Sequence, residues 1–170
     1  MKKLFIAAAL LVTAPALAQP IKTIMPNPTN PEAQAPRPAR ARGIPTALAI
    51  EAAEVSNATC LANGTKVTTV VTDSVGEPIV IISGDGAATI TQRIGMGKAQ
   101  WVIQTKGPSA AGATAMPALV DTLGTARPGG IPIMAGSDMV GAIAASGSPS
   151  GQADEVCVKA GLAKIQDRIK

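Results

Sequence analysis

Residues 129–155 constrain the fold more than any other segment, because their pattern is that of a β-hairpin leading directly into a helix. Residues 131–134 and 139–145 are short apolar strand candidates, and the Gly-Ser-Asp sequence at residues 136–138 supplies a turn between them. An antiparallel sheet is therefore expected in the second half of the chain.

The corner that follows this hairpin is a candidate ligand site. The Ser-Pro-Ser-Gly sequence at residues 148–151 ends the second strand candidate. Asp154 and Glu155 then fall in the first turn of the next predicted helix, where carboxylates suit the positive end of the helix dipole. Hydroxyl groups and a glycine beside a helix start can hold a ligand, but this pattern alone does not identify one.

The start of the chain has the pattern of an export signal. Two lysines precede an apolar stretch over residues 4–17, and the Ala-Leu-Ala sequence at residues 16–18 is a signal-peptidase cleavage pattern. A membrane anchor is the alternative, but the stretch is shorter than the about 20 residues that span a bilayer, and Pro15 interrupts it. Residues 1–18 are therefore predicted to be a cleaved signal peptide of a bacterial protein. The mature protein is expected to be periplasmic or secreted, with no membrane span after cleavage.

Residues 19–43 are predicted to be a disordered, proline-rich linker, because their six prolines leave no room for a helix or a paired strand. Three arginines make this segment basic, but their density is lower than that of a nucleic-acid-binding arm. From residue 44 onward the chain has nine basic and ten acidic residues, so the net charge of +4 comes from the residues before it. No nucleic-acid partner is therefore expected.

The folded part, residues 44–170, has the size of one ordinary domain but an unusual composition. It contains no histidine and no tyrosine, and Trp101 is its single aromatic residue. The core is therefore expected to consist of Ala, Val, Ile, Leu and Met, stabilised by many small contacts. The lack of histidine excludes Ser-His-Asp and Cys-His nucleophile activation and histidine-containing metal sites.

Periodicity and turn signals give a predicted order of elements. A helix over residues 45–62 is expected to stop at Asn63 and Gly64. The later elements are two strands at 66–72 and 78–83, a helix at 91–104, a helical region from Ser109 to near Gly124, the hairpin, and a final helix at 152–168. This order is typical of an α+β fold with an antiparallel sheet.

The two cysteines are candidates for a disulfide bond. Cys60 lies late in the first predicted helix, and Cys157 lies on an apolar face of the last one. If the two helices lie side by side, a bond between them is expected in an oxidising compartment. Closing a loop of this length stabilises by up to about 4 to 5 kcal/mol in the chain-entropy model. Two buried thiols are the alternative.

Six short motifs make the interpretation more specific. They are Gly84-Asp85-Gly86-Ala87, Lys98-Ala99, Gly107-Pro108-Ser109, GGIPI from residue 129, VGAIAASG from residue 140, and Asp154-Glu155. In this order and spacing they resemble the GlcG/HbpS family of haem-binding proteins over nearly all of residues 44–170. The resemblance implies a profilin-like fold, in which a five-stranded antiparallel sheet carries the terminal helices on one face and the middle helices on the other, assembled into a homo-oligomer.

The resemblance also implies where haem is contacted. The haem-contacting threonine of secreted members corresponds to Ser109, which is a weak iron-ligand candidate. Pro108, directly before it, is a further candidate for contact with haem. Lys98, and Arg93 about one turn earlier, are candidates to neutralise a haem propionate. The alternatives are that Ser109 only caps a helix and that the basic residues lie on a solvated helix face. Thioethers are further candidate ligands but are more typical of core packing; they belong to Met96, Met116, Met134 and Met139.

Three hypotheses for the function follow. In the first, the protein is an exported haem-binding module, sensing or sequestering haem without catalytic chemistry of its own, because secreted members of the family bind haem and report it to a sensor kinase. In the second, it is an accessory protein or enzyme that binds a small hydroxy acid such as glycolate or lactate, near Ser109, Lys98 and residues 148–151. In the third, it is a ligand-free oligomeric scaffold.

Overall fold

A computed structural model of the chain describes residues 41–115 and 126–170. The predicted signal peptide, nearly all of the predicted linker, Met116 and the predicted helix end near Gly124 lie outside the described residues. The described elements are α2 (Thr46–Ala62), β1 (Thr68–Thr72), β2 (Pro78–Ser83), α3 (Ile90–Thr105), the 3-10 helix η1 (Ser109–Ala111), α4 (Gly112–Ala115), β3 (Gly130–Ala135), β4 (Asp138–Ser146), α6 (Gly151–Ile165) and the 3-10 helix η3 (Gln166–Arg168).

The strands form one antiparallel sheet with the order β2-β1-β4-β3. The α+β class and the antiparallel pairing are confirmed, but the expected number of five strands is wrong, because the described residues form a sheet of four. Outside residues 116–125, the described segments between these strands are helices, turns and short loops. After β4, Gly147 adopts a φ of +139°, and Ser150 caps α6, so the chain leaves the sheet without a further strand.

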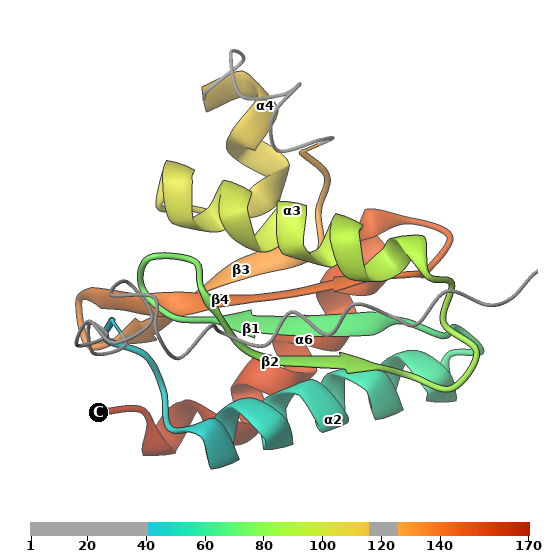
Figure 1. Cartoon of the computed structure of the whole chain (residues 1–170), viewed down its shortest axis with the longest axis horizontal. Helices are drawn as coiled ribbons and strands as arrows, with labels where there is room; N and C mark the ends of the chain where they lie inside the picture. The colour runs from blue at the N-terminus through green and yellow to red at the C-terminus, as the bar shows by residue number, and fades with distance from the viewer. Residues whose placement is uncertain (1–40, 116–125) are drawn as a thin grey trace, which may run out of the picture. The chain divides into compact units, whose positions relative to one another are not determined.

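Helices cover both faces of the sheet, α3 on one face and α2 with α6 on the other (Figure 1). The alternation of side chains along each strand creates two aliphatic cores. In β1, Val70 packs in the core beneath α3, whereas Val71 packs in the core beneath α2 and α6. The expected arrangement of terminal and middle helices is therefore confirmed for the described elements.

The helices α2 and α6 pack closely together. Gly161 of α6 lies directly against Ser56 and the carbonyl group of Ala52 in α2, and a side-chain carbon at this position would overlap both. The predicted disulfide is confirmed, since Cys60 and Cys157 are bonded with a Cα–Cα distance of 5.5 Å and a sequence separation of 97 residues. The disulfide thus joins the first described helix to the last long one.

None of the helices within residues 41–115 and 126–170 has the length and apolar character that crossing a membrane requires.

Candidate functional site

Lys98 is the centre of the site, because α3 directs this cationic side chain into the interior. Lys98 is 2% exposed. Its Nζ donates to the carbonyl oxygen of Ala145 in β4 at 2.8 Å and to Oδ2 of Asp154 in α6 at 2.7 Å. A buried charge requires such partners, because desolvation without them is costly. The pair therefore links α3, β4 and the start of α6.

Asp154 also holds the corner between β4 and α6. Its Oδ1 accepts a hydrogen bond from the backbone amide of Ser148 at 2.9 Å. Two residues after Ser148, the hydroxyl of Ser150 accepts from the amide of Ala153 at 3.2 Å and caps α6. The corner predicted from the sequence is thus fixed in place by one buried carboxylate and one helix cap.

Burial lowers the pKa of Lys98 from its ordinary value of 10.5. The hydrogen bond and the negative charge of Asp154 oppose this shift, as does the charge of Glu155, whereas the nearby positive charge of Arg127 adds to it. Desolvation is the largest cause, so the pKa of Lys98 lies below that of a surface lysine despite the ion pair.

Ser109 is buried beside the same cluster. Its Oγ donates to the carbonyl oxygen of Arg127 and accepts from the amide of Gly130 at 3.0 Å. The interpretation of Ser109 as a helix cap is wrong, because it is the first residue of η1 and its hydroxyl instead ties η1 to the start of β3. Ser109 and Lys98 both lie next to the Gly129–Gly130 segment, since a Cβ at Gly130 would be 3.1 Å from Ser109 Oγ and 3.0 Å from the carbonyl oxygen of Lys98.

The other two predicted contact residues lie elsewhere. Arg93 is exposed near the start of α3, and Pro108 is exposed just beyond its end. The four residues therefore do not share one surface: two are exposed near opposite ends of α3, and Lys98 and Ser109 are buried. Met96 and Met139 pack against the core beneath α3, as expected for core methionines.

A pocket of about 210 Å³ opens next to the Lys98–Asp154 pair. Its lining residues come from α3, the end of β4, the corner before α6, the first turn of α6 and the segment before β3; they are Thr91, Ile94, Lys98, Arg127, Ser146, Gly147, Ser148, Pro149, Ser150, Gly151 and Asp154. The pocket therefore includes the candidate corner of residues 148–151 and one of the predicted cationic residues.

Comparison with known proteins gives the family. Residues 44–163 match the family described as haem degrading protein HbpS-like. The chain belongs to the HbpS-like family. No match to this HbpS-like chain was found among curated protein sequences.

Solved structures resemble this HbpS-like protein over most of its length. A double mutant of HbpS from Streptomyces reticuli is 28% identical, with a TM-score of 0.68 and coverage of 77% of this chain and 97% of that one. The protein ORFY from Klebsiella pneumoniae is 17% identical, with a TM-score of 0.66 and coverage of 76% and 94%. PduOC, solved as a complex with haem, is 15% identical, with a TM-score of 0.64 and coverage of 71% and 94%. The last two comparisons show the fold alone.

Sequence reasoning missed Arg127, Ser146 and the pairing of Lys98 with Asp154. A lysine within an apolar helical stretch, such as Lys98, is a local signal for a buried charge, and so is a carboxylate at a helix start, such as Asp154. The pairing of Lys98 with Asp154 has no local signal, because only the tertiary fold brings the two residues together. Arg127 and Ser146 gave no local signal, since their positions matter only through the pocket that they line.

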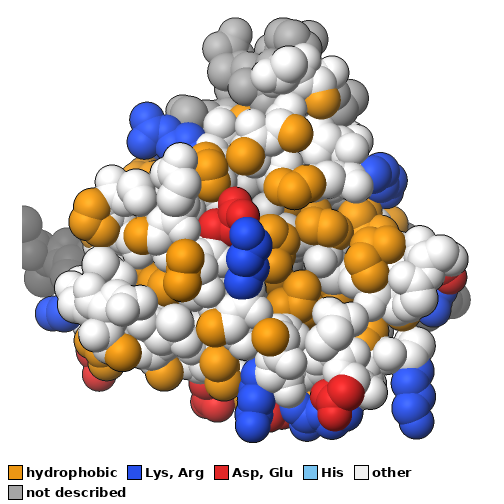
Figure 2. All heavy atoms as spheres, turned by 180° about the vertical axis from the view of Figure 1, so that it is seen from behind, with side chains coloured by type: hydrophobic (Ala, Val, Ile, Leu, Met, Phe, Trp, Pro, Cys, Tyr) orange, Lys and Arg blue, Asp and Glu red, His pale blue; other side chains and the backbone are white. Residues whose placement is uncertain are grey.

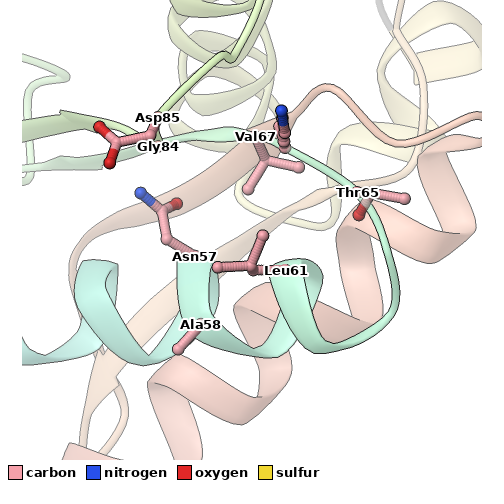
Figure 3. Close-up of a pocket in the computed structure, with 8 residues that line it drawn as sticks. Asn57, Ala58, Leu61, Thr65, Val67, Gly84 and Asp85 are labelled. Atoms are coloured by element: carbon pink, nitrogen blue, oxygen red, sulfur yellow. The ribbon is translucent and has the colours of Figure 1, made fainter.

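A second pocket of this HbpS-like protein, of about 150 Å³, lies between α2 and the strand ends (Figure 3). Leu61 of α2 points toward Val67 across it, and Ala58 also lines the pocket. The side chain of Asn57 is engaged at both ends, donating to the carbonyl oxygen of Ile82 and accepting from the hydroxyl of Thr69. None of the predicted site residues lines this pocket.

The part of the chain that the structure describes has no group of three or more His, Cys, Asp and Glu side chains placed to hold a metal ion. On the face seen in Figure 2, the Lys and Arg side chains are interspersed with acidic, polar and apolar ones and form no continuous basic surface.

Proposed function

We propose that this HbpS-like protein binds haem. The observation that carries the proposal is the family match, which covers residues 44–163 and hence almost all of the domain. The 28% identity to HbpS of Streptomyces reticuli, over 97% of that chain, supports it.

The outer face of α3 is the surface that best fits a flat, apolar macrocycle. Ile90 and Ile94 are 45% and 40% exposed and lie one helical turn apart, so that their side chains form an apolar stripe. Arg93 is exposed on the same helix. Ile94 also lines the pocket next to Lys98 and Arg127, so the apolar stripe borders that pocket. Haem on this stripe would place cationic side chains beside its propionates.

Ser109 remains the candidate iron ligand in this proposal. Its hydroxyl is already used in two hydrogen bonds, since it donates to the carbonyl oxygen of Arg127 and accepts from the amide of Gly130. Ligation therefore requires η1 to move away from the start of β3. A neutral hydroxyl is a weak ligand, so this arrangement suits haem that exchanges rather than haem that is held permanently.

The test is a titration of haemin into the purified protein, followed by the Soret band. A saturable shift is expected, and it should weaken in Ser109→Ala. Ser56→Ala is the matched control, because it removes another buried serine hydroxyl, bonded within α2, and should leave the titration unchanged. The absence of any Soret shift up to stoichiometric haemin would contradict the proposal.

We also propose that the protein does not degrade haem with its own side chains, although its family is described as haem degrading. The chain has no histidine, which removes the commonest general acid and base. With ascorbate and oxygen, the Soret band of the complex should decay no faster than that of free haemin. Faster decay with formation of a tetrapyrrole cleavage product would show the opposite.

Export and assembly complete the proposal. An intramolecular disulfide is typical of an oxidising compartment, which supports a periplasmic or secreted protein with a cleaved leader.

Leu61 on α2 and Val156 on α6 are more than half exposed, and apolar side chains gather at several places on the face in Figure 2. These surfaces support a homo-oligomer, and the same surfaces could receive a sensor protein. Light scattering and the mass of the mature chain test assembly and cleavage.

A further inference from the structure

The pocket beside Lys98 contains a polar group that no partner explains. Ser146 is 6% exposed and ends β4, where it lies opposite Thr68. The hydroxyl of Thr68 contacts that of Thr91 on α3, so the side chain of Ser146 points to the same face of the sheet and into the pocket. Among the described residues, the Ser146 hydroxyl has no hydrogen-bond partner. Thr72 Oγ1 is the only fully buried side-chain oxygen without a partner among the described residues, so the Ser146 hydroxyl is reached from the pocket and is free to bond to a ligand there.

Hydrogen-bond donors and positive charge surround this hydroxyl. Arg127 is an exposed residue that lines the pocket, and its guanidinium forms no ion pair within the described ranges. The amide of Gly151 lies in the first turn of α6, where backbone N–H groups have no partner inside the helix. Lys98 lies beneath, and two of its three N–H donors are used.

The negative charge in the pocket is already compensated. Both carboxylate oxygens of Asp154 accept hydrogen bonds, one from Lys98 and one from the Ser148 amide. With Arg127 added, the pocket has one net positive charge and the positive end of the 15-residue helix α6. A singly charged anion balances this charge, whereas a dianion would leave an excess of negative charge next to Asp154.

We propose that this pocket binds a carboxylate group, held by the Arg127 guanidinium, the Ser146 hydroxyl and the Gly151 amide above the Lys98–Asp154 pair. Ile94 forms an apolar wall for the carbon chain that bears the carboxylate. The volume of about 210 Å³ accommodates a small carboxylate but not a large ligand as a whole. Two sources have this chemistry, a free small carboxylic acid and the propionate of a haem lying on α3. Only the second source rests on the proposed haem function.

The first arm of the test uses acetate alone. Sodium acetate is titrated into the full, disulfide-bonded protein, and backbone amide signals are followed by NMR, with sodium chloride as the salt control. Saturable shifts at Ser146 and Gly151 are expected. Affinity should fall about tenfold or more in Arg127→Gln and about threefold to tenfold in Ser146→Ala. Arg168→Gln and Ser137→Ala are matched controls outside the pocket and should bind acetate normally.

The second arm identifies the source by comparing haemin with its dimethyl ester, which lacks both carboxylates. If haem propionate is the occupant, haemin binds about tenfold more tightly than the ester, and Arg127→Gln removes this difference. If the two bind equally while acetate saturates, a free small acid is the occupant. Absence of a Soret shift would contradict the haem function and leave the acetate arm to decide. Acetate shifts no different from those of chloride, together with equal or absent binding of haemin and its ester, would overturn the carboxylate site.

Discussion

Lys98 of α3 and Asp154 of α6 form an ion pair of 2.7 Å whose side chains are only 2% and 3% exposed. The two residues are 56 positions apart in the sequence, on elements from opposite faces of the sheet. The pair is therefore a tertiary link, and it also forms the floor of the pocket proposed to bind a carboxylate.

Removal of only one of the two charged side chains should destabilise the fold strongly. Lys98→Met leaves the Asp154 carboxylate buried without its cation, which costs about 3 to 5 kcal/mol in the free energy of unfolding. The double variant Lys98→Met/Asp154→Leu should recover most of the loss, since neither charge then remains. Urea denaturation of both variants measures this.

The exposed pair between Lys159 and Glu155 is the control for this prediction. Lys159 is 62% exposed at its side chain, and exposed pairs at this helical spacing contribute only about 0.3 to 0.5 kcal/mol. Lys159→Met should therefore change the free energy of unfolding very little. Equal losses for Lys98→Met and Lys159→Met would mean that burial does not set the strength of the inner pair.

The lowered pKa of Lys98 predicts a dependence of stability on pH. Between its folded-state pKa and the ordinary value of 10.5, the unfolded chain holds a proton on Lys98 that the folded chain has released. The free energy of unfolding therefore receives a contribution from Lys98 that increases as pH rises through this window. Comparing wild type with Lys98→Met across alkaline pH isolates it, and identical slopes in the two proteins would contradict the prediction.

The disulfide between Cys60 and Cys157 should contribute a large share of the stability. A closed loop of about 100 residues corresponds to about 4.7 kcal/mol in the chain-entropy model. The Cys60→Ala/Cys157→Ala variant should lose up to this amount in urea denaturation. Thiol labelling of the denatured wild type before and after reduction checks the bond itself, since labelling without reductant would show free thiols.

The sequence predicted the local elements well, because their signals are local. The strands at 78–83 and in the hairpin and the stop at Asn63 and Gly64 agree with the structure. The disulfide also agrees, but its prediction depended on the packing of the two terminal helices, since the cysteines are 97 residues apart. The strand number was wrong because it was inferred from a resemblance rather than from a fifth strand pattern in the chain.

The site was predicted less completely, because its chemistry depends on distant residues. Lys98 was identified as a cation for a ligand, but its first partner is Asp154, which had been interpreted only as a helix-start carboxylate. Ser146 had been counted as the end of a strand motif, and its lack of a partner becomes visible only when α3 and β4 are placed together. Local patterns fix the elements, whereas the distribution of buried polar groups requires the fold.

Gly129 gives the sharpest test of the packing around the pair. Its φ is +114°, and a Cβ at this position would lie 2.7 Å from Lys98 Nζ and 2.8 Å from Asp154 Cβ. Gly129→Ala should therefore combine backbone strain of about 1 to 2 kcal/mol with overpacking of about 1 to 3 kcal/mol. Gly136→Ala is the matched control, because Gly136 also has a positive φ, of +61°, but nothing lies within 4 Å of its Cβ position. Urea denaturation should show the larger loss for Gly129→Ala, and the difference between the two variants measures the cost of displacing Lys98 from Asp154. Equal losses would mean that the backbone conformation alone requires glycine there.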